Sequence, residues 1–100
     1  MAFKFAFIFL SPDGDPDKHK AIVLTPSVEA YIVSAKNYEE AIKVAKKLVE
    51  EGIEAIELCG GFGHKGVVKI VDAVEGKIPV GAIRFDNHPK LEFKSGDEIF

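Results

Sequence analysis

The chain has 100 residues, a hydrophobic fraction of 47% and a formal net charge of −3 at pH 7. A chain of this length predicts one domain, residues 1–100, with a core of its own, and its negative charge excludes the basic surface that a nucleic-acid-binding protein needs. The single cysteine, Cys59, excludes an intrachain disulfide framework and favours a reducing, cytoplasmic location.

Residues 3–10 predict the first strand, which is apolar on both faces. One face carries four phenylalanines and the other carries smaller residues: Phe3, Phe5, Phe7 and Phe9 against Ala6, Ile8 and Leu10. Two apolar faces are typical of a central strand that is covered on both sides. The run is too short for a signal peptide or for a membrane span of ~20 apolar residues, so we expect no membrane association.

The next segment predicts a short helix and a second strand. Asp15 followed by Pro16 is typical of a helix start and predicts a helix over 16–22. Residues 28–35 are rich in strand-forming side chains but include a charged one, Glu29, so we expect an edge strand there.

The second half of the chain predicts two helices and two strands. Asn37 and Glu40 form a capping-box pattern, and apolar residues at helical spacing follow as far as Gly52, which is typical of a helix end. The later elements are a strand at 53–58, a helix at 65–75 and a strand at 79–85. Residues 86–100 are irregular, and we expect their apolar side chains to dock on this chain or on a neighbour. These side chains are Leu91, Phe93, Ile99 and Phe100.

The alternation of strands and helices predicts an α/β fold with right-handed crossovers. We expect a small parallel four-stranded sheet in the flavodoxin-like order 2-1-3-4, with helices on both faces. The alternative is an α+β split sheet in which the strands at 3–10 and 28–35 are antiparallel. That alternative is favoured if residues 16–26 are not helical.

The expected topology brings three loops to one edge of the sheet. In open parallel sheets, ligands bind beyond the carboxyl ends of the strands, at the switch point in strand order. That point lies between the loops at 11–19 and 59–66, with the loop at 86–89 beside them. These loops carry all three histidines and several carboxylates: His19, His64, His88, Asp13, Asp15 and Asp86. We expect Asp13, Asp86 and His88 to line one ligand site, with Arg84 at the end of the last strand.

The loop CGGFGHKG, residues 59–66, is the candidate ligand cradle. Gly60, Gly61 and Gly63 allow positive φ and a close approach of backbone N–H groups to a ligand. The helix N-terminus that follows favours an anion, and Lys65 adds positive charge. The glycine spacing matches neither a dinucleotide fingerprint nor a Walker loop. The alternative is a tight turn that requires glycines and binds nothing.

Cys59, Glu57 and His64 are the candidate catalytic residues. Cys59 precedes a helix N-terminus, where thiols become nucleophiles, although most lone cysteines are small buried apolar residues. Glu57 lies on the same strand face, where a buried carboxylate acts as an acid or base, pairs with Arg84, or opens to solvent. The histidines lack a short metal-ligand spacing, so we expect no metal site. The sequence does not identify a cofactor.

Four segments resemble a known family. They are AFIFLSP, EGIEAIELCGGFGHKG, IPVGAIRFD and SGDEIF, and they span nearly the whole chain. The family consists of roughly hundred-residue bacterial and archaeal proteins and is described as a domain of unknown function. The resemblance implies a compact prokaryotic domain and brings no activity, substrate, cofactor or catalytic residue with it.

Three functions fit these observations. The first is a small cytoplasmic protein that binds an anionic small molecule at residues 59–66 as a homo-oligomer. The second is an enzyme of racemase, lyase or hydrolase type that uses Cys59 with Glu57 or His64. The third is a purely structural or interaction protein.

Overall fold

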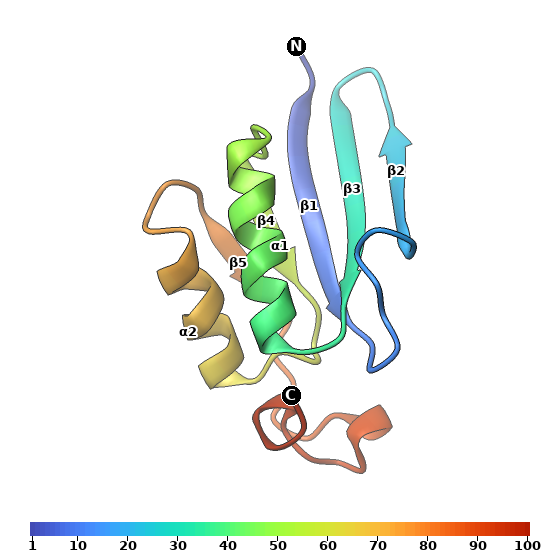
Figure 1. The fold of residues 1–100 in the computed structure, drawn as a ribbon, viewed down its shortest axis with the longest axis vertical. Coiled ribbons are helices and arrows are strands. Elements are labelled where there is room, and N and C mark those ends of the chain that lie inside the picture. The colour runs from blue at the N-terminus through green and yellow to red at the C-terminus, as the bar shows by residue number, and fades with distance from the viewer.

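The chain forms one five-stranded mixed sheet with two helices, as a computed structural model that describes residues 1–100 shows (Figure 1). The strands are β1 (Phe3–Leu10), β2 (Lys20–Leu24), β3 (Val28–Ala35), β4 (Ala55–Leu58) and β5 (Val80–Ala82). The helices are α1 (Tyr38–Glu50) and α2 (His64–Ala73), followed by two 3-10 turns, η1 (Pro89–Leu91) and η2 (Gly96–Glu98). The strand order is β2-β3-β1-β4-β5. β3, β1, β4 and β5 are parallel, and β2 is antiparallel to β3.

The purely parallel four-stranded sheet is therefore wrong. The four predicted strands do occur in the order 2-1-3-4, as β3-β1-β4-β5, but the predicted helix at 16–22 does not form. Instead, the backbone carbonyl of Asp15 closes a turn, and the next residues extend to form β2. The split-sheet alternative fits in that the sheet contains one antiparallel pair, but that pair is β2 and β3, whereas the strands at 3–10 and 28–35 are parallel. β3 is consequently an internal strand and not the expected edge.

Both helices lie on one face of the sheet, so the expectation of helices on both faces is also wrong (Figure 1). The crossovers from β3 to β4 and from β4 to β5 advance in the same direction across the sheet. Two right-handed crossovers in one direction place their helices on the same side. The core lies between this layer and the strand residues that face it: Ala6, Ile8, Val33, Ala35, Ile56 and Leu58.

The helix boundaries follow from local chemistry. Asn37 is the N-cap of α1 and its side chain accepts a hydrogen bond from the N–H of Glu40, as the capping pattern predicts. Gly52 follows the helix with a φ of 91°, a conformation that favours glycine. Neither helix has the length and apolar composition that a membrane crossing requires.

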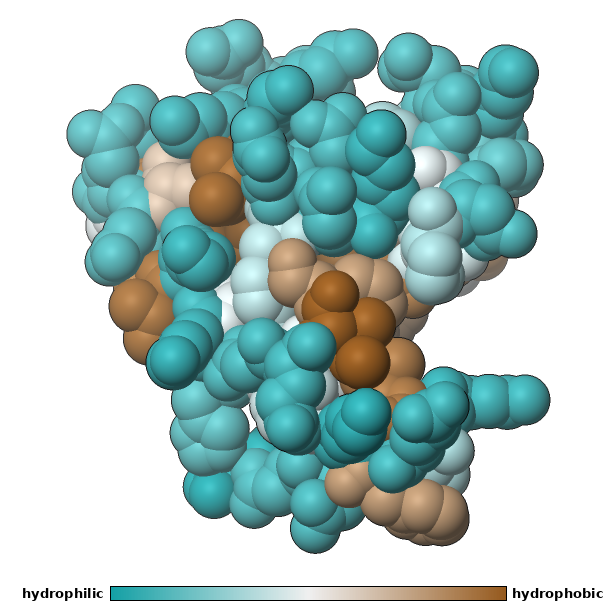
Figure 2. Space-filling model, turned by 60° about the horizontal axis from the view of Figure 1, so that its bottom comes forward, coloured by the Kyte–Doolittle hydropathy of each residue, from teal (hydrophilic) through white to brown (hydrophobic).

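The C-terminal segment, residues 86–100, lies at the end of the sheet where β1 finishes (Figure 1). Of the four expected apolar anchors, Phe100 packs against the core and its ring centre is 6.3 Å from that of Tyr38. Leu91 is half-buried, whereas Phe93 and Ile99 are exposed. Figure 2 views this end of the molecule and shows hydrophobic atoms gathered in its middle, bordered by hydrophilic atoms and by a hollow.

Candidate functional site

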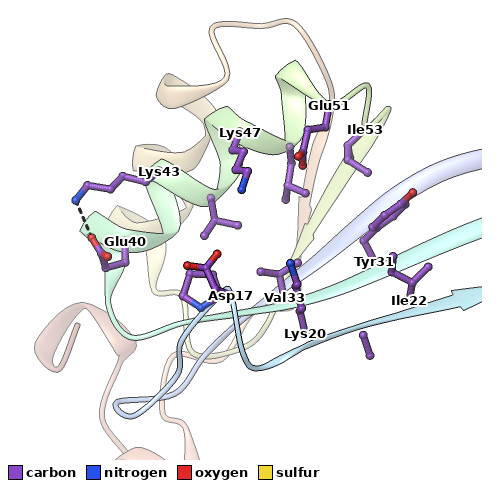
Figure 3. A pocket seen from close by; sticks show the side chains of 14 residues that line it. Asp17, Lys20, Ile22, Tyr31, Val33, Glu40, Lys43, Lys47, Glu51 and Ile53 are labelled. Carbon is purple, nitrogen blue, oxygen red and sulfur yellow. Dashed lines mark ion pairs between the residues drawn. The ribbon is translucent and has the colours of Figure 1, made fainter.

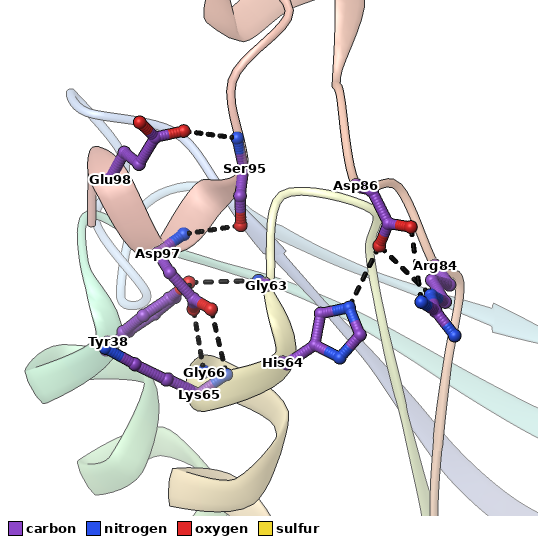
Figure 4. Close-up of polar contacts among 10 residues, drawn as sticks. All are labelled: Tyr38, Gly63, His64, Lys65, Gly66, Arg84, Asp86, Ser95, Asp97 and Glu98. Carbon is purple, nitrogen blue, oxygen red and sulfur yellow. Dashed lines mark hydrogen bonds and ion pairs between the residues drawn. The ribbon is translucent and has the colours of Figure 1, made fainter.

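The glycine loop, residues 59–66, connects β4 to α2 and is closed by the C-terminal segment. The carboxylate of Asp97 accepts hydrogen bonds from the backbone N–H groups of Lys65 (3.0 Å) and Gly66 (3.1 Å) (Figure 4). These are first-turn amides of α2, and such amides have no partner within a helix. The anion that the sequence analysis expected at this helix N-terminus is therefore a side chain of the protein itself.

Tyr38 joins the same network from α1. Its hydroxyl donates to Asp97 Oδ1 over 2.7 Å and accepts from the N–H of Gly63 over 3.0 Å. Burial raises the pKa of Tyr38, and the hydrogen bond to Asp97 raises it further. Burial alone would also raise the pKa of Asp97, but the hydrogen bonds from Lys65, Tyr38 and Gly66 outweigh it and hold that pKa below its usual value.

The loop needs its glycines for close packing and not for backbone conformation. A Cβ at Gly60 would lie 2.1 Å from the Phe85 ring, one at Gly63 would lie 2.4 Å from Asp97, and one at Gly66 would lie 2.5 Å from the Tyr38 ring. None of the loop glycines has a positive φ, since Gly52 and Gly76 are the glycines that do. The expectation of positive φ in the loop is wrong.

A polar cluster lies beside the loop, where α2 begins and the chain leaves β5 (Figure 4). His64 Nε2 is 2.9 Å from Asp86 Oδ1. Arg84 donates to both oxygens of the same carboxylate, from Nε over 3.0 Å and from a terminal nitrogen over 3.2 Å. The bond from Arg84, and then that from His64, lowers the pKa of Asp86 to about 2. Asp86 in turn raises the pKa of Arg84.

This cluster borders a groove of about 300 Å³ between α2 and residues 82–85, where the chain leaves β5. His64 and Arg84 are its two charged or ionisable lining residues. The remaining lining is formed by Phe62, Gly63, Val67, Val68, Ala82, Ile83 and Phe85. Apolar walls with a few convergent polar groups are typical of small-molecule sites, and this volume lies at the small end of their range.

A second groove, of about 790 Å³, lies between α1 and the strands β2 and β3 (Figure 3). Its floor includes Ile22, Val33 and Leu48, and its rim carries three lysines and three carboxylates. These are Lys20, Lys43, Lys47, Asp17, Glu40 and Glu51. This groove was not predicted from the sequence, because β2 forms one of its walls and the first residues of β2 fall within the helix predicted over 16–22.

The predicted catalytic residues lie in different surroundings. Cys59 Sγ accepts hydrogen bonds from the N–H groups of Leu10 (3.4 Å) and Gly61 (3.3 Å). Glu57 is exposed in the single chain, on the face of the sheet that carries no helix. The expected Glu57–Arg84 pair does not form, because Arg84 binds Asp86.

The other predicted site residues make local contacts. His19 and His88 each accept a backbone N–H in their own loop, from Asp15 and Lys90. Asp13 accepts from the Ser11 hydroxyl. No group of three or more histidine, cysteine or carboxylate side chains is placed to share a metal ion.

Asp97 is the residue that the sequence analysis missed at this site. Its segment was predicted to be irregular, yet Ser95 and Glu98 have the S-x-x-E spacing of a capping box. The structure contains that box at the start of η2. Recognising it would have predicted a turn that fixes Asp97 in place.

Comparison with known proteins gives one family and one partial relative. The model of a family of unknown function (DUF6506) matches residues 3–98. Hydroxylamine reductase 2 of Clostridium acetobutylicum is 37% identical over 60 residues, which are 59% of this chain and 11% of that protein. The chain thus spans about a tenth of that relative's length. No solved structure matches.

Proposed function

This chain belongs to the family of unknown function DUF6506, and we propose that it is a binding protein for a small anionic molecule with an apolar part. The proposed site is the groove between α2 and residues 82–85. The observation that carries the proposal is that Arg84 and His64 line one apolar groove and are held together by one carboxylate, Asp86.

The geometry leaves donors free for a ligand. Arg84 has five N–H donors and uses two of them on Asp86. Because the guanidinium is planar and fixed by Asp86, its remaining donors are oriented for a carboxylate or phosphate. His64 uses Nε2 on Asp86, so Nδ1 is available. The apolar part of the ligand would lie against Phe62, Val67 and Ile83.

The ligand anion binds beside the glycine loop in this proposal and not on the first amides of α2. The N–H groups of Lys65 and Gly66 already have Asp97 as their acceptor. Gly63 contributes backbone to the wall of the groove, while Gly60 allows Phe85 to close that wall. We also propose cytoplasmic location, prokaryotic origin and homo-oligomeric assembly, and ligand binding in the groove does not depend on any of the three.

The test is a nuclear magnetic resonance titration of the ¹⁵N-labelled chain with benzoate, which combines a carboxylate with an apolar ring. We expect saturable shifts at His64, Val67 and residues 83–85. Benzyl alcohol, which lacks the charge, should bind more weakly. Arg84→Gln should abolish the benzoate shifts, whereas Lys69→Gln removes the same charge from an exposed site on α2 and should leave them unchanged. Shifts that are absent, or that survive Arg84→Gln, would contradict the proposal.

A second candidate site is the larger groove, favoured by two lysines. Lys43 is paired with Glu40, but Lys20 and Lys47 have no ion pair. Figure 3 shows Lys20 and Lys47 directed into the space between α1 and the strands. This groove would take a larger amphipathic anion, such as dodecanoate. A titration with dodecanoate that shifts residues 20–22 and 44–48, and that Lys47→Gln weakens, would support it.

An enzymatic function and a purely structural function have less in their favour. No hydrogen bond joins Cys59 to Glu57 or His64, so no observation favours the enzyme. The similarity to hydroxylamine reductase 2 does not support a reductase activity for this chain, because only about a tenth of that protein is matched. A purely structural protein should bind neither benzoate nor dodecanoate, and the two titrations distinguish it from the binding proposals.

A further inference from the structure

One face of the sheet has no helix over it. The strand register places alternate residues of neighbouring strands on this face, opposite to the buried set that faces α1 and α2. We call it the open face, and its side chains are Phe3, Phe5, Phe7, Phe9, Val28, Ala30, Ile32, Ala21, Val23, Ala55 and Glu57. Ser34 lies on the same face opposite Phe9, but it is buried against Gly14 of the loop at 11–19. The face therefore crosses four strands without interruption.

The open face is apolar almost throughout. Phe3 is 45% exposed and Val23 is 57% exposed. The other phenylalanines of β1, which are Phe5, Phe7 and Phe9, are half-buried. Glu57 is its one charged residue, and no lysine or arginine lies among its side chains. Continuous exposed apolar surface of this extent marks an interaction site on a soluble protein.

The parallel direction of the strands also indicates that a partner covers the open face. Antiparallel sheets commonly leave one face in water, but parallel sheets almost always have both faces covered. Four of the five strands here are parallel, and their helices cover one face only. We propose that a second copy of this chain covers the open face, so that two sheets pack face to face in a symmetric dimer.

A second copy is the occupant that fits the size and chemistry of the face. Two strands of eight residues, one of five and one of four, spaced about 4.8 Å apart with a rise of about 3.3 Å per residue, give a sheet footprint of roughly 400 Å², and the side chains that project from it increase its accessible area. Stable interfaces bury about 800 Å² on each partner. Two apolar sheet faces pack about 10 Å apart with interdigitated side chains, and a twofold axis brings identical faces together.

The charges of the open face also bear on which partner can cover it. Without lysine or arginine, the open face cannot neutralise nucleic acid or an anionic membrane. Glu57 lies on β4 next to Gly81 of the edge strand β5, which has no side chain to cover it. Its carboxylate can therefore reach solvent at the rim of a dimer, where burial does not penalise it.

Dimerisation through the open face leaves the ligand groove accessible. That groove lies on the helix side of the sheet, against α2. The dimer therefore does not depend on the proposed function, and either can fail without the other.

The test is sedimentation equilibrium of the full chain over a wide range of concentration. The monomer mass is 10.9 kDa, and we expect twice that mass for the unmodified protein. Phe7→Lys, at the centre of the open face, should give a monomer. Val23 and Leu24 form a matched pair because they are adjacent, exposed and on opposite faces. Val23→Asp should weaken the dimer at least tenfold, and Leu24→Asp should not change it.

Circular dichroism melts of each variant establish that it is folded, and the two β2 variants remain informative if Phe7→Lys does not fold. A protein that is monomeric at every concentration would overturn the proposal. A dimer that tolerates Val23→Asp, or that is weakened equally by Leu24→Asp, would overturn it as well.

Discussion

The Tyr38 hydroxyl lies 2.7 Å from the carboxylate of Asp97, although 59 residues separate them in the sequence. Through this contact the C-terminal segment is fastened to α1, and through the Lys65 and Gly66 amides it is fastened to α2. Residues 95–98 thus bridge both helices across the glycine loop (Figure 4). The loop, the helix start and the chain end form one structural unit.

Removing the Asp97 carboxylate should loosen this unit. Asp97→Ala leaves two first-turn amides of α2 without an acceptor, and loss of such a cap costs about 1–2 kcal/mol of unfolding free energy. Urea denaturation measures the loss, and amide hydrogen exchange at Lys65 and Gly66 should accelerate. Asp72→Ala is the control, because Asp72 is exposed near the other end of α2 and its side chain makes no hydrogen bond. Equal stabilities of the two variants would show that the cap contributes nothing.

The same carboxylate should make stability depend on acid pH. The pKa of Asp97 is lower in the folded protein than the value of about 3.9 for an unperturbed aspartate. Its contribution is therefore present above the unfolded pKa and is lost as the pH falls through the folded one. The difference in unfolding free energy between wild type and Asp97→Asn should be constant near neutrality and shrink below about pH 4. A difference that persists unchanged into acid would contradict the assigned role of the charge.

The strands that the sequence predicted best are those with long apolar alternation. The bounds of β1 and β3 match the prediction residue by residue. β2 was missed because Asp15 and Pro16 form a convincing local helix start, whereas the pairing of residues 20–24 with β3 is a contact between chain segments. Tertiary pairing overrides such local preferences. The open face was missed for a related reason, since the phenylalanines of β1 indicate burial without indicating what buries them.

The site was predicted in part. The sequence placed the loops at 59–66 and 86–89 at one edge of the sheet, and the structure joins His64 to Asp86 there. The role of the glycines was assigned to a ligand, but their space is filled by Phe85, Asp97 and Tyr38. The glycines within a loop indicate that another group approaches the backbone closely. They do not indicate whether that group is a ligand or a distant part of the same chain.

A methyl group at Gly96 should separate the C-terminal segment from the glycine loop. A Cβ there would lie 1.7 Å from the carbonyl oxygen of Gly61, and backbone cannot rotate away as a side chain can. Overpacking of this kind costs about 1–3 kcal/mol, so Gly96→Ala should lower the melting temperature and expose Tyr38 to solvent quenchers. Gly81→Ala is the matched control, because nothing lies within 4 Å of its Cβ position. Comparable melting temperatures for both variants would contradict the close docking.

The Asp86 carboxylate should titrate with a pKa of about 2, because Arg84 and then His64 stabilise its charged form. Arg84→Gln removes the larger of these causes, so the pKa should rise towards the ordinary aspartate value of about 3.9. His64→Ala should raise it less. Carboxyl ¹³C chemical shifts followed through a pH titration measure the pKa of Asp86 directly in the wild type and in both variants. If His64→Ala changed the pKa more than Arg84→Gln, the histidine would be the main partner of Asp86. The free donors of Arg84 would then no longer be positioned for a ligand anion.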